Sequence, residues 1–185
     1  MDDRRLPSRS ATSNALPEPL ELVTTSPEAT RAFAAQLAAV AEPGDVVCLW
    51  GDLGAGKTVF AKGFGAGLGV TDTILSPSFV LMGEYAGRLP LFHIDLYRLA
   101  TATEVIDGGL LDDRQNAGVV LIEWPDRLGD ALPPDRLDVR IDGGADEPRR
   151  LLLEAHGAAN PRYANAATVA GAHAVAPFVA TTVDR

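Results

Sequence analysis

The clearest periodic pattern in the chain is a run of apolar side chains at helical spacing after residue 26. Ser26 is a residue type that caps helices, Pro27 suits the first helical position, and Glu28 complements the positive end of the helix dipole. The apolar residues that would share one face of this helix are Ala29, Phe33, Leu37 and Val40. The pattern therefore predicts a helix that the Pro-Gly pair at positions 43 and 44 ends.

Short apolar runs predict strands, and their order along the chain indicates the fold class. The continuous apolar runs at 45–50 and 119–124 are typical of buried strands. Further strands are predicted at 79–85, 91–95, 137–141 and 150–154, the last two as a hairpin, and further helices at 57–68 and 101–111. Helices and strands alternate early and strands dominate late, which predicts one α/β sandwich with a mixed β-sheet.

Three glycines fall inside the helix predicted at 57–68. Each of them, Gly63, Gly65 and Gly67, weakens a helix relative to alanine. Their small size predicts that this helix packs closely against the sheet.

Composition divides the chain into three parts. Residues 1–19 are polar, contain prolines and show no periodicity, which predicts a disordered leader. Residues 20–155 hold the predicted helices and strands as one domain. Residues 156–185 are rich in alanine and poor in charge, which predicts a flexible tail or a loosely attached segment that binds a partner.

The formal net charge of −9 limits the partners that the chain can attract. A chain of this charge lacks the long-range attraction to phosphate backbones, so we expect no DNA partner and expect any nucleic acid to be reached through another protein. Cys48 is the single cysteine and lies in an apolar run, which predicts a buried thiol and fits a reducing cytoplasm. No apolar run approaches the roughly 20 residues of a membrane span.

The sequence GDLGAGKT at positions 51–58 carries the strongest chemical signal. It fits Gly-x-x-x-x-Gly-Lys-Thr between a predicted buried strand and a predicted helix, which is the context that a phosphate-binding loop requires. Backbone N–H groups from Leu53 to Thr58 would surround the phosphates. Lys57 would reach the β and γ phosphates, and the Thr58 hydroxyl would bind Mg²⁺. The expected architecture is therefore a P-loop NTPase-like three-layer sandwich.

Two acidic residues follow apolar strand segments. Glu123 comes after five apolar residues, and Asp95 ends the strand predicted at 91–95. A carboxylate in such a place is costly unless a cation or donors lie near, so both are candidates to act on Mg²⁺ or the γ-phosphate. His93 shares a strand face with Asp95, and we interpret it as a core or supporting residue rather than a proton shuttle. Trp124 either shields the site or packs in the core.

The sequence SPSF at positions 76–79 lies between these elements. The hydroxyls of Ser76 and Ser78 fit a loop that senses the γ-phosphate or positions a water molecule. Local physics alone favours a simpler interpretation, in which Pro77 makes a turn that opens a strand.

The sequences GDLGAGKT, SPSF, HIDLYR and IEWP occur in the order and approximate spacing of the bacterial TsaE family. Over residues 22–154 the chain resembles this family, the small ATPase of tRNA threonylcarbamoyladenosine biosynthesis. The resemblance implies ATP binding and hydrolysis with Mg²⁺ in a complex with TsaB and TsaD, with tRNA reached through these partners. It implies that hydrolysis resets the TsaB–TsaD complex and does not perform the transfer. The family's usual Ser-Pro-Thr-Phe/Tyr has Ser78 here, which keeps the hydroxyl.

The resemblance also implies roles for individual residues. Lys57, Asp95 and Glu123 correspond to catalytic residues, and Thr58 and Glu123 to Mg²⁺ ligands. The residues that correspond to the nucleotide site are Ser26, Leu53, Gly54, Ala55, Gly56, Lys57, Thr58, Asp126, Arg127, Leu128, Gly129 and a late arginine, Arg149 or Arg150, of which Arg150 is chosen. The segment 126–129 is expected to lie against the base.

Two other functions stay open. A small-molecule or nucleotide kinase needs an acceptor pocket and usually a lid that carries arginines, and no Arg-rich insertion lies between the glycine loop and Glu123. An ATP-dependent binding module with negligible turnover is the third possibility, because the sequence shows no obvious general base. ATP rather than GTP as the nucleotide comes from the resemblance alone.

Overall fold

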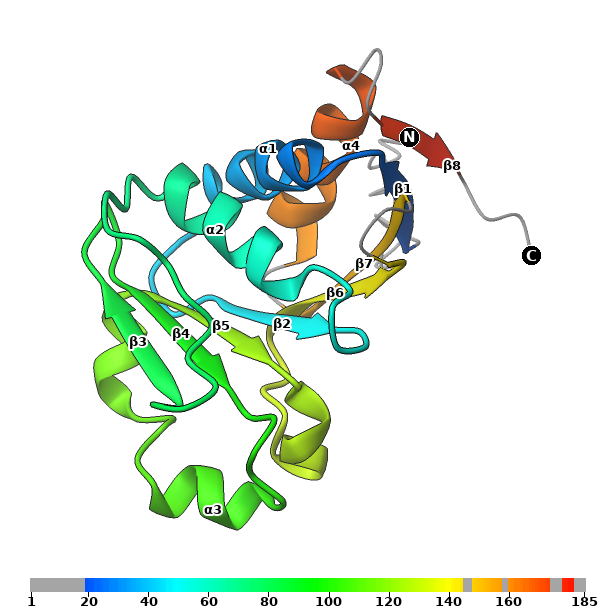
Figure 1. Ribbon diagram of the computed structural model, residues 1–185. Coiled ribbons are helices and arrows are strands. Elements are labelled where there is room, and N and C mark those ends of the chain that lie inside the picture. The colour runs from blue at the N-terminus through cyan, green and yellow to red at the C-terminus, as the bar shows by residue number, and fades with distance from the viewer. Residues whose placement is uncertain (1–18, 145–147, 158–159, 174–177, 182–185) are drawn as a thin grey trace, which may run out of the picture.

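The computed structural model describes residues 19–144, 148–157, 160–173 and 178–181 (Figure 1). The strands are β1 Leu20–Thr24, β2 Val46–Trp50, β3 Met82–Tyr85, β4 Leu91–Asp95, β5 Val119–Glu123, β6 Arg136–Asp142, β7 Arg149–His156 and β8 Phe178–Thr181. The helices are α1 Pro27–Ala38, α2 Lys57–Gly67, α3 Ala102–Asp107 and α4 Asn160–His173, with 3-10 segments η1 Asp113–Ala117 and η2 Pro125–Ala131. Residues 1–18, and with them nearly all of the predicted leader, lie outside the described residues.

Within the described residues the strands form one mixed sheet in the order β3-β4-β5-β2-β6-β7-β1-β8. The central neighbours β4, β5, β2 and β6 are parallel, and the outer pairs are antiparallel. The predicted hairpin is β6–β7. The carboxyl ends of β2, β4 and β5 therefore meet at the same edge of the sheet, where ligands bind in folds of this type.

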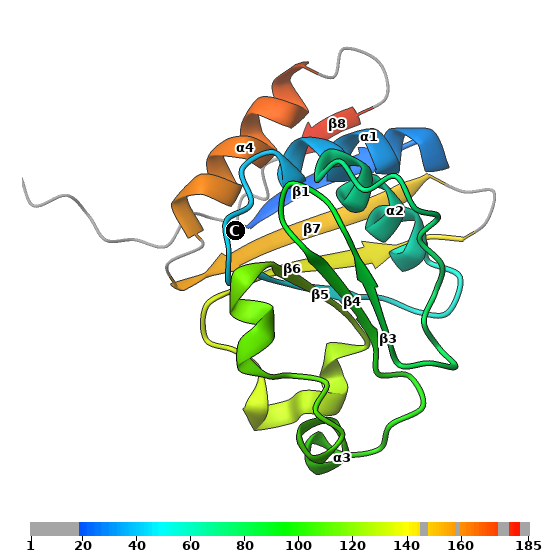
Figure 2. The same cartoon turned by 90° about the vertical axis from the view of Figure 1, so that its left-hand side faces the viewer.

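Helices cover both faces of the central strands, which makes three layers (Figures 1 and 2). Because successive strand side chains point to opposite faces, Val47 and Leu49 of β2 join the core beneath α1, α2 and α4. Cys48 points to the other face and packs in a second core with Val105 of α3 and Leu128 of η2. The predicted α/β three-layer sandwich with a mixed sheet is confirmed, as is the burial of Cys48.

The glycines of α2 bring this helix close to a second helix as well as to the sheet. A Cβ atom at Gly63 would lie 2.3 Å from the carbonyl oxygen of Arg31, and one at Gly67 would lie 2.4 Å from that of Ala35, both on α1. A Cβ atom at Gly65 would lie 2.1 Å from Ile74 Cδ1 in the loop after α2 and 3.2 Å from Leu91 of β4, so of the three glycines this one approaches the sheet. The predicted packing against the sheet is therefore correct for Gly65 and wrong for the other two.

The strands differ from the prediction at two places, the start of the domain and the segment after residue 78. The strand β1 was not predicted, although it pairs with β7 along its whole length. The strand predicted from residue 79 begins only at Met82, because residues 78–80 form a turn that the bond from Leu81 N–H to the Pro77 carbonyl closes at 2.6 Å. Leu81 has a left-handed φ of 65°, which breaks the extended backbone at this point.

The Ala-rich segment after residue 156 contains a packed helix where the sequence predicted a flexible tail. Tyr163 of α4 is fully buried, and its hydroxyl donates to Asp45 Oδ2 at 2.7 Å. Ala167 is also buried in the core beneath α1. Alanine has the highest helix propensity of the residues. The Ala-rich, weakly charged composition that predicted flexibility is therefore also compatible with the helix α4. For residues 160–173 the prediction is therefore corrected.

Candidate nucleotide site

A cleft of about 260 Å³ opens at the edge of the sheet where β2, β4 and β5 end. Its lining residues are Leu53, Gly54, Gly56, Lys57, Thr58, Val59, Ser76, Ser78, Asp95, Tyr97, Glu123 and Trp124. The structure therefore brings together the glycine loop, the serine loop at 76–79 and both strand-end carboxylates.

The glycine loop leaves β2 with backbone angles that favour glycine. Gly51, Gly54 and Gly56 have φ values of 136°, 84° and 114°. A side chain at any of these positions would be strained, because L-residues rarely adopt such angles. Gly56 directly precedes α2, so the loop places the N-terminus of an 11-residue helix at the cleft. Free N–H groups and the helix dipole make this end of α2 suited to bind phosphate.

Lys57 lies over its own loop. Its Nζ donates to the carbonyl oxygens of Gly51 at 2.6 Å and Asp52 at 2.9 Å, and it lies 3.9 Å from the centre of the Trp124 ring. Burial lowers the pKa of Lys57 from its ordinary value, and the carboxylate of Glu123 opposes that shift. The Lys57 ammonium group therefore lies at the cleft. It can leave the two neutral carbonyl oxygens and bind an anionic phosphate oxygen instead.

Trp124 follows Glu123 with a left-handed φ of 61°. Non-glycine residues in this region are strained, and such residues cluster at functional sites. Its ring packs against Tyr97 at a centroid distance of 5.0 Å. Trp124 therefore forms an aromatic wall of the cleft with Tyr97, and it also packs against the core that contains Cys48, so the structure agrees with elements of both interpretations.

Thr58 and Glu123 meet across the cleft. The Thr58 hydroxyl donates to Glu123 Oε1 at 3.0 Å, and only 3% of Glu123 is exposed. Among the described residues no cluster of three or more His, Cys, Asp or Glu side chains could hold a metal by itself. A hydroxyl and one carboxylate nevertheless fit Mg²⁺, which takes few protein ligands and completes its shell with phosphate oxygens and water.

Asp95 is held by the serine loop. Its Oδ2 accepts hydrogen bonds from Ser76 Oγ at 3.1 Å and from Ser78 Oγ, and its Oδ1 accepts one from the Tyr97 N–H at 2.9 Å. Asp95 is nearly buried, with 2% exposed. These donors stabilise an ionised carboxylate inside the cleft, and they tie the loop at 76–79 to the end of β4.

The late arginine at the glycine loop is Arg149, and the choice of Arg150 is wrong. Arg149 is buried, and its Nε donates to the Ala55 carbonyl at 3.1 Å. A Cβ atom at Gly56 would lie 2.7 Å from the same Nε. Arg150 is exposed and pairs with Glu21 of β1 at 3.0 Å. The two residues point to opposite faces of β7, so only Arg149 reaches the loop.

Several residues assigned to the nucleotide by resemblance do not line the cleft. Ser26 caps α1 and accepts a hydrogen bond from the Ala29 N–H at 3.1 Å. Ala55 is buried beneath the loop, and Leu128 is buried in the core under the sheet. The other residues of this set, Asp126, Arg127 and Gly129, lie in η2 directly after Trp124. Contact of the segment 126–129 with a base stays a prediction.

Sequence reasoning missed two residues of the site, Val59 and Tyr97. Tyr97 belongs to the HIDLYR sequence, and its backbone N–H caps the Asp95 carboxylate. Its position two residues after a strand-end aspartate is the signal that could have identified it. Val59 lies on the first turn of α2 and has no chemical signal of its own.

A mixed α/β sandwich with a glycine-rich phosphate loop between a central strand and a helix defines a P-loop NTPase-like protein. The chain matches the family described as "Threonylcarbamoyl adenosine biosynthesis protein TsaE" over residues 24–151. The chain belongs to the TsaE family.

Individual relatives agree with this assignment. The tRNA threonylcarbamoyladenosine biosynthesis protein TsaE of Bacillus subtilis is 45% identical over 135 residues, which cover 72% of this chain and 84% of the relative. The protein of the same name from Treponema pallidum is 37% identical over 134 residues, covering 72% and 99%. The crystal structure of Bacillus subtilis YdiB superposes with a TM-score of 0.67 at 38% identity, covering 85% of this chain and 98% of that one.

The described residues include no helix that is long and apolar enough to cross a membrane.

Proposed function

We propose that this chain is a Mg²⁺-dependent ATPase that supports tRNA threonylcarbamoyladenosine modification. The observation that carries the proposal is the contact of Thr58 with Glu123 beside the phosphate loop, with Asp95 at the end of the neighbouring strand. The curated relatives that the chain matches are named as tRNA threonylcarbamoyladenosine biosynthesis proteins, which supports the pathway.

The residues of the cleft have separate tasks in this proposal. Thr58 and Glu123 would hold Mg²⁺, which when bound neutralises charge on the β and γ phosphates. Lys57 leaves the carbonyls of Gly51 and Asp52 and binds phosphate oxygens. Asp95 orients the attacking water, and its three hydrogen bonds fix the carboxylate in place.

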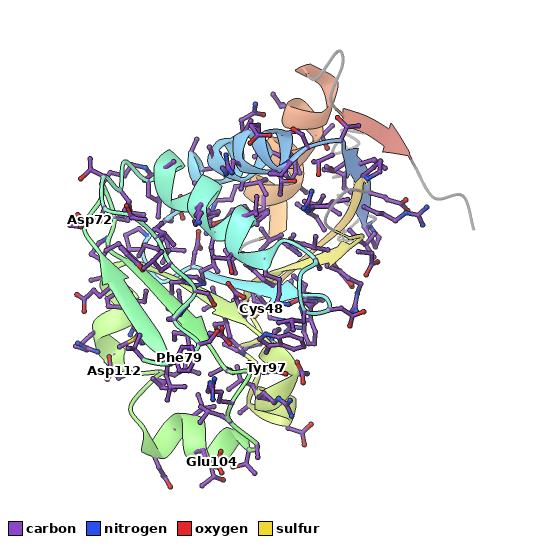
Figure 3. All side chains as sticks on the ribbon, in the orientation of Figure 1. Cys48, Asp72, Phe79, Tyr97, Glu104 and Asp112 are labelled. Atoms are coloured by element: carbon purple, nitrogen blue, oxygen red, sulfur yellow. The ribbon has the colours of Figure 1, made fainter. Side chains whose placement is uncertain are left out.

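We further propose that the partner is the TsaB–TsaD complex and that hydrolysis resets it. Large apolar side chains stand exposed next to the cleft: Leu53 is 79% exposed, Phe79 85% and Val80 72%. Arg98, which follows Tyr97 in the chain, lies over the Phe79 ring at 4.3 Å. Phe79 and Tyr97 are both labelled in Figure 3. Exposed apolar patches beside a site mark surfaces that bind other proteins. A partner seated there would contact the serine loop that holds Asp95.

The proposal is tested by following the γ-phosphate of labelled ATP in the presence of Mg²⁺. We expect slow release of inorganic phosphate, and none with the Thr58→Ala variant. Label found on an added nucleoside or sugar would show a kinase instead. Among the described residues no arginine lines the cleft, which weighs against the arginine-bearing lid of a kinase. ATP binding without any release, with partners present, would show a binding module.

A further inference from the structure

His93 is fully buried on β4, two residues before Asp95. Its Nε2 lies 2.9 Å from Glu123 Oε1 on the neighbouring strand β5. The other ring nitrogen, Nδ1, is buried and has no hydrogen-bond partner among the described residues. Within the described residues, the side chain of His93 therefore makes one polar contact, with the Glu123 carboxylate that also contacts Thr58.

The contacts decide which nitrogen carries the proton. A proton on Nε2 makes a hydrogen bond to the Glu123 carboxylate. A proton on Nδ1 would find no acceptor among the described residues, and it would leave two lone pairs facing each other between Nε2 and Oε1. The Nε2–H form is thus the one that the surroundings satisfy, with His93 as a donor to Glu123.

Glu123 is consequently held from two sides through one oxygen. Oε1 accepts from Thr58 of α2 at 3.0 Å and from His93 of β4 at 2.9 Å. No hydrogen bond to Oε2 is found within the described parts of the chain. The pair of donors fixes the rotation of the carboxylate and leaves Oε2 as the oxygen without a protein partner.

We propose that His93 is a positioning residue that orients Glu123 toward Mg²⁺. This inference rests on the proposed function and deepens it, because it explains why a buried polar ring stands between the apolar residues Phe92 and Ile94 of β4. Hydrogen-bond partners of metal-binding carboxylates typically contribute about 10-fold to 100-fold to metal affinity.

The test measures how strongly Mg²⁺ tightens binding of a fluorescent ADP analogue, compared with its binding in EDTA. His93→Gln keeps an amide N–H near the position of Nε2, whereas His93→Leu keeps bulk and removes the donor. We expect His93→Leu to need about 10-fold to 100-fold more Mg²⁺ for half of the tightening. We expect His93→Gln to behave much like the parent chain, and the affinity in EDTA to be alike in all three.

The outcomes separate this inference from the proposed function. If Mg²⁺ does not tighten binding to the parent chain, the proposed function fails. If it tightens the parent and His93→Leu equally, or if the folded Gln variant is as defective as the Leu variant, the positioning role is overturned. Should His93→Leu not fold, His93→Asn replaces it, because its amide reaches only the Nδ1 position. A deficit in Asn that Gln lacks supports the role, and equal Mg²⁺ dependence in Asn, Gln and parent contradicts it.

Discussion

Asp95 and Glu123 occupy the same register position on the adjacent parallel strands β4 and β5, yet their carboxylates have separate partners. Glu123 contacts Thr58, the second residue of α2, whereas Asp95 contacts the serine loop at 76–79. The two carboxylates are therefore held by different parts of the fold, Glu123 by the start of α2 and Asp95 by the serine loop. In the proposed function, Glu123 would therefore bind the cation and Asp95 would act on the γ-phosphate chemistry.

This division predicts different defects in two isosteric variants. Glu123→Gln should lose most of the Mg²⁺-dependent tightening of nucleotide binding, because it removes an anionic ligand. Asp95→Asn should keep that tightening but lower the rate of hydrolysis by about 10²-fold or more, as expected when a group that acts on the attacking water is lost. Binding and single-turnover assays at limiting Mg²⁺ distinguish the two. Identical profiles for both variants would contradict the division.

Arg149 should support nucleotide binding and Arg150 should not. Arg149→Met leaves the Ala55 carbonyl without its buried donor, which costs about 1–3 kcal/mol and loosens the loop. Nucleotide affinity in EDTA should therefore fall by about tenfold, since 1.4 kcal/mol corresponds to a factor of ten. Arg150→Met is the matched control, because that side chain is exposed and pairs with Glu21. Equal losses in both variants would show that the contact with Ala55 is unimportant.

The sequence could locate both carboxylates but could not choose between the two arginines. Glu123 and Asp95 each follow a mostly apolar segment, so the neighbouring residues are enough to predict a strand and the place where it ends. Arg149 and Arg150 precede three consecutive leucines at 151–153, and a continuous apolar run does not show which face is inward. The choice depends on the pairing of β7 with β1 and β6, which the sequence alone does not reveal.

The C-terminal helix shows the same limit. Its packing includes the contact of Tyr163 with Asp45, a residue that directly precedes β2 and is far away in sequence. Composition reports only that the segment is rich in alanine, and it carries no information on such a contact. Conversely, the three-layer architecture could be predicted from the order of helices and strands and from the phosphate-loop motif. In the structure, alternating positions of β2 and β5 face different cores.

Tyr163 should stabilise the whole domain through α4. Tyr163→Phe removes the bond to the Asp45 carboxylate and should lower the free energy of unfolding by about 2 kcal/mol. Tyr163→Ala also empties a buried site and should cost about 3–5 kcal/mol. Urea unfolding measures both, with Val169→Ala as a control because Val169 is 54% exposed on the same helix. Unchanged stability in both tyrosine variants would contradict the packing of α4 and support the prediction of a flexible tail.

Cys48 should report on opening of the fold. Burial, followed by the charge of Asp138, raises the pKa of this thiol from 9.0 to about 12. Between these values the unfolded thiol loses its proton and the folded one keeps it, so this group lowers stability as pH rises. At pH 8 a thiol reagent should label the chain only as fast as it opens. Bound nucleotide should slow labelling, and fast labelling at all nucleotide concentrations would contradict the buried position.

The proposed function is tested most sharply by ATP turnover of the purified chain with and without the TsaB–TsaD complex. We expect slow phosphate release by the chain alone and a clear increase with assembled partners. The stimulated rate should be lost in Asp95→Asn while that variant still joins the complex. Turnover that stays the same when TsaB and TsaD are correctly assembled with the chain would contradict the proposed function.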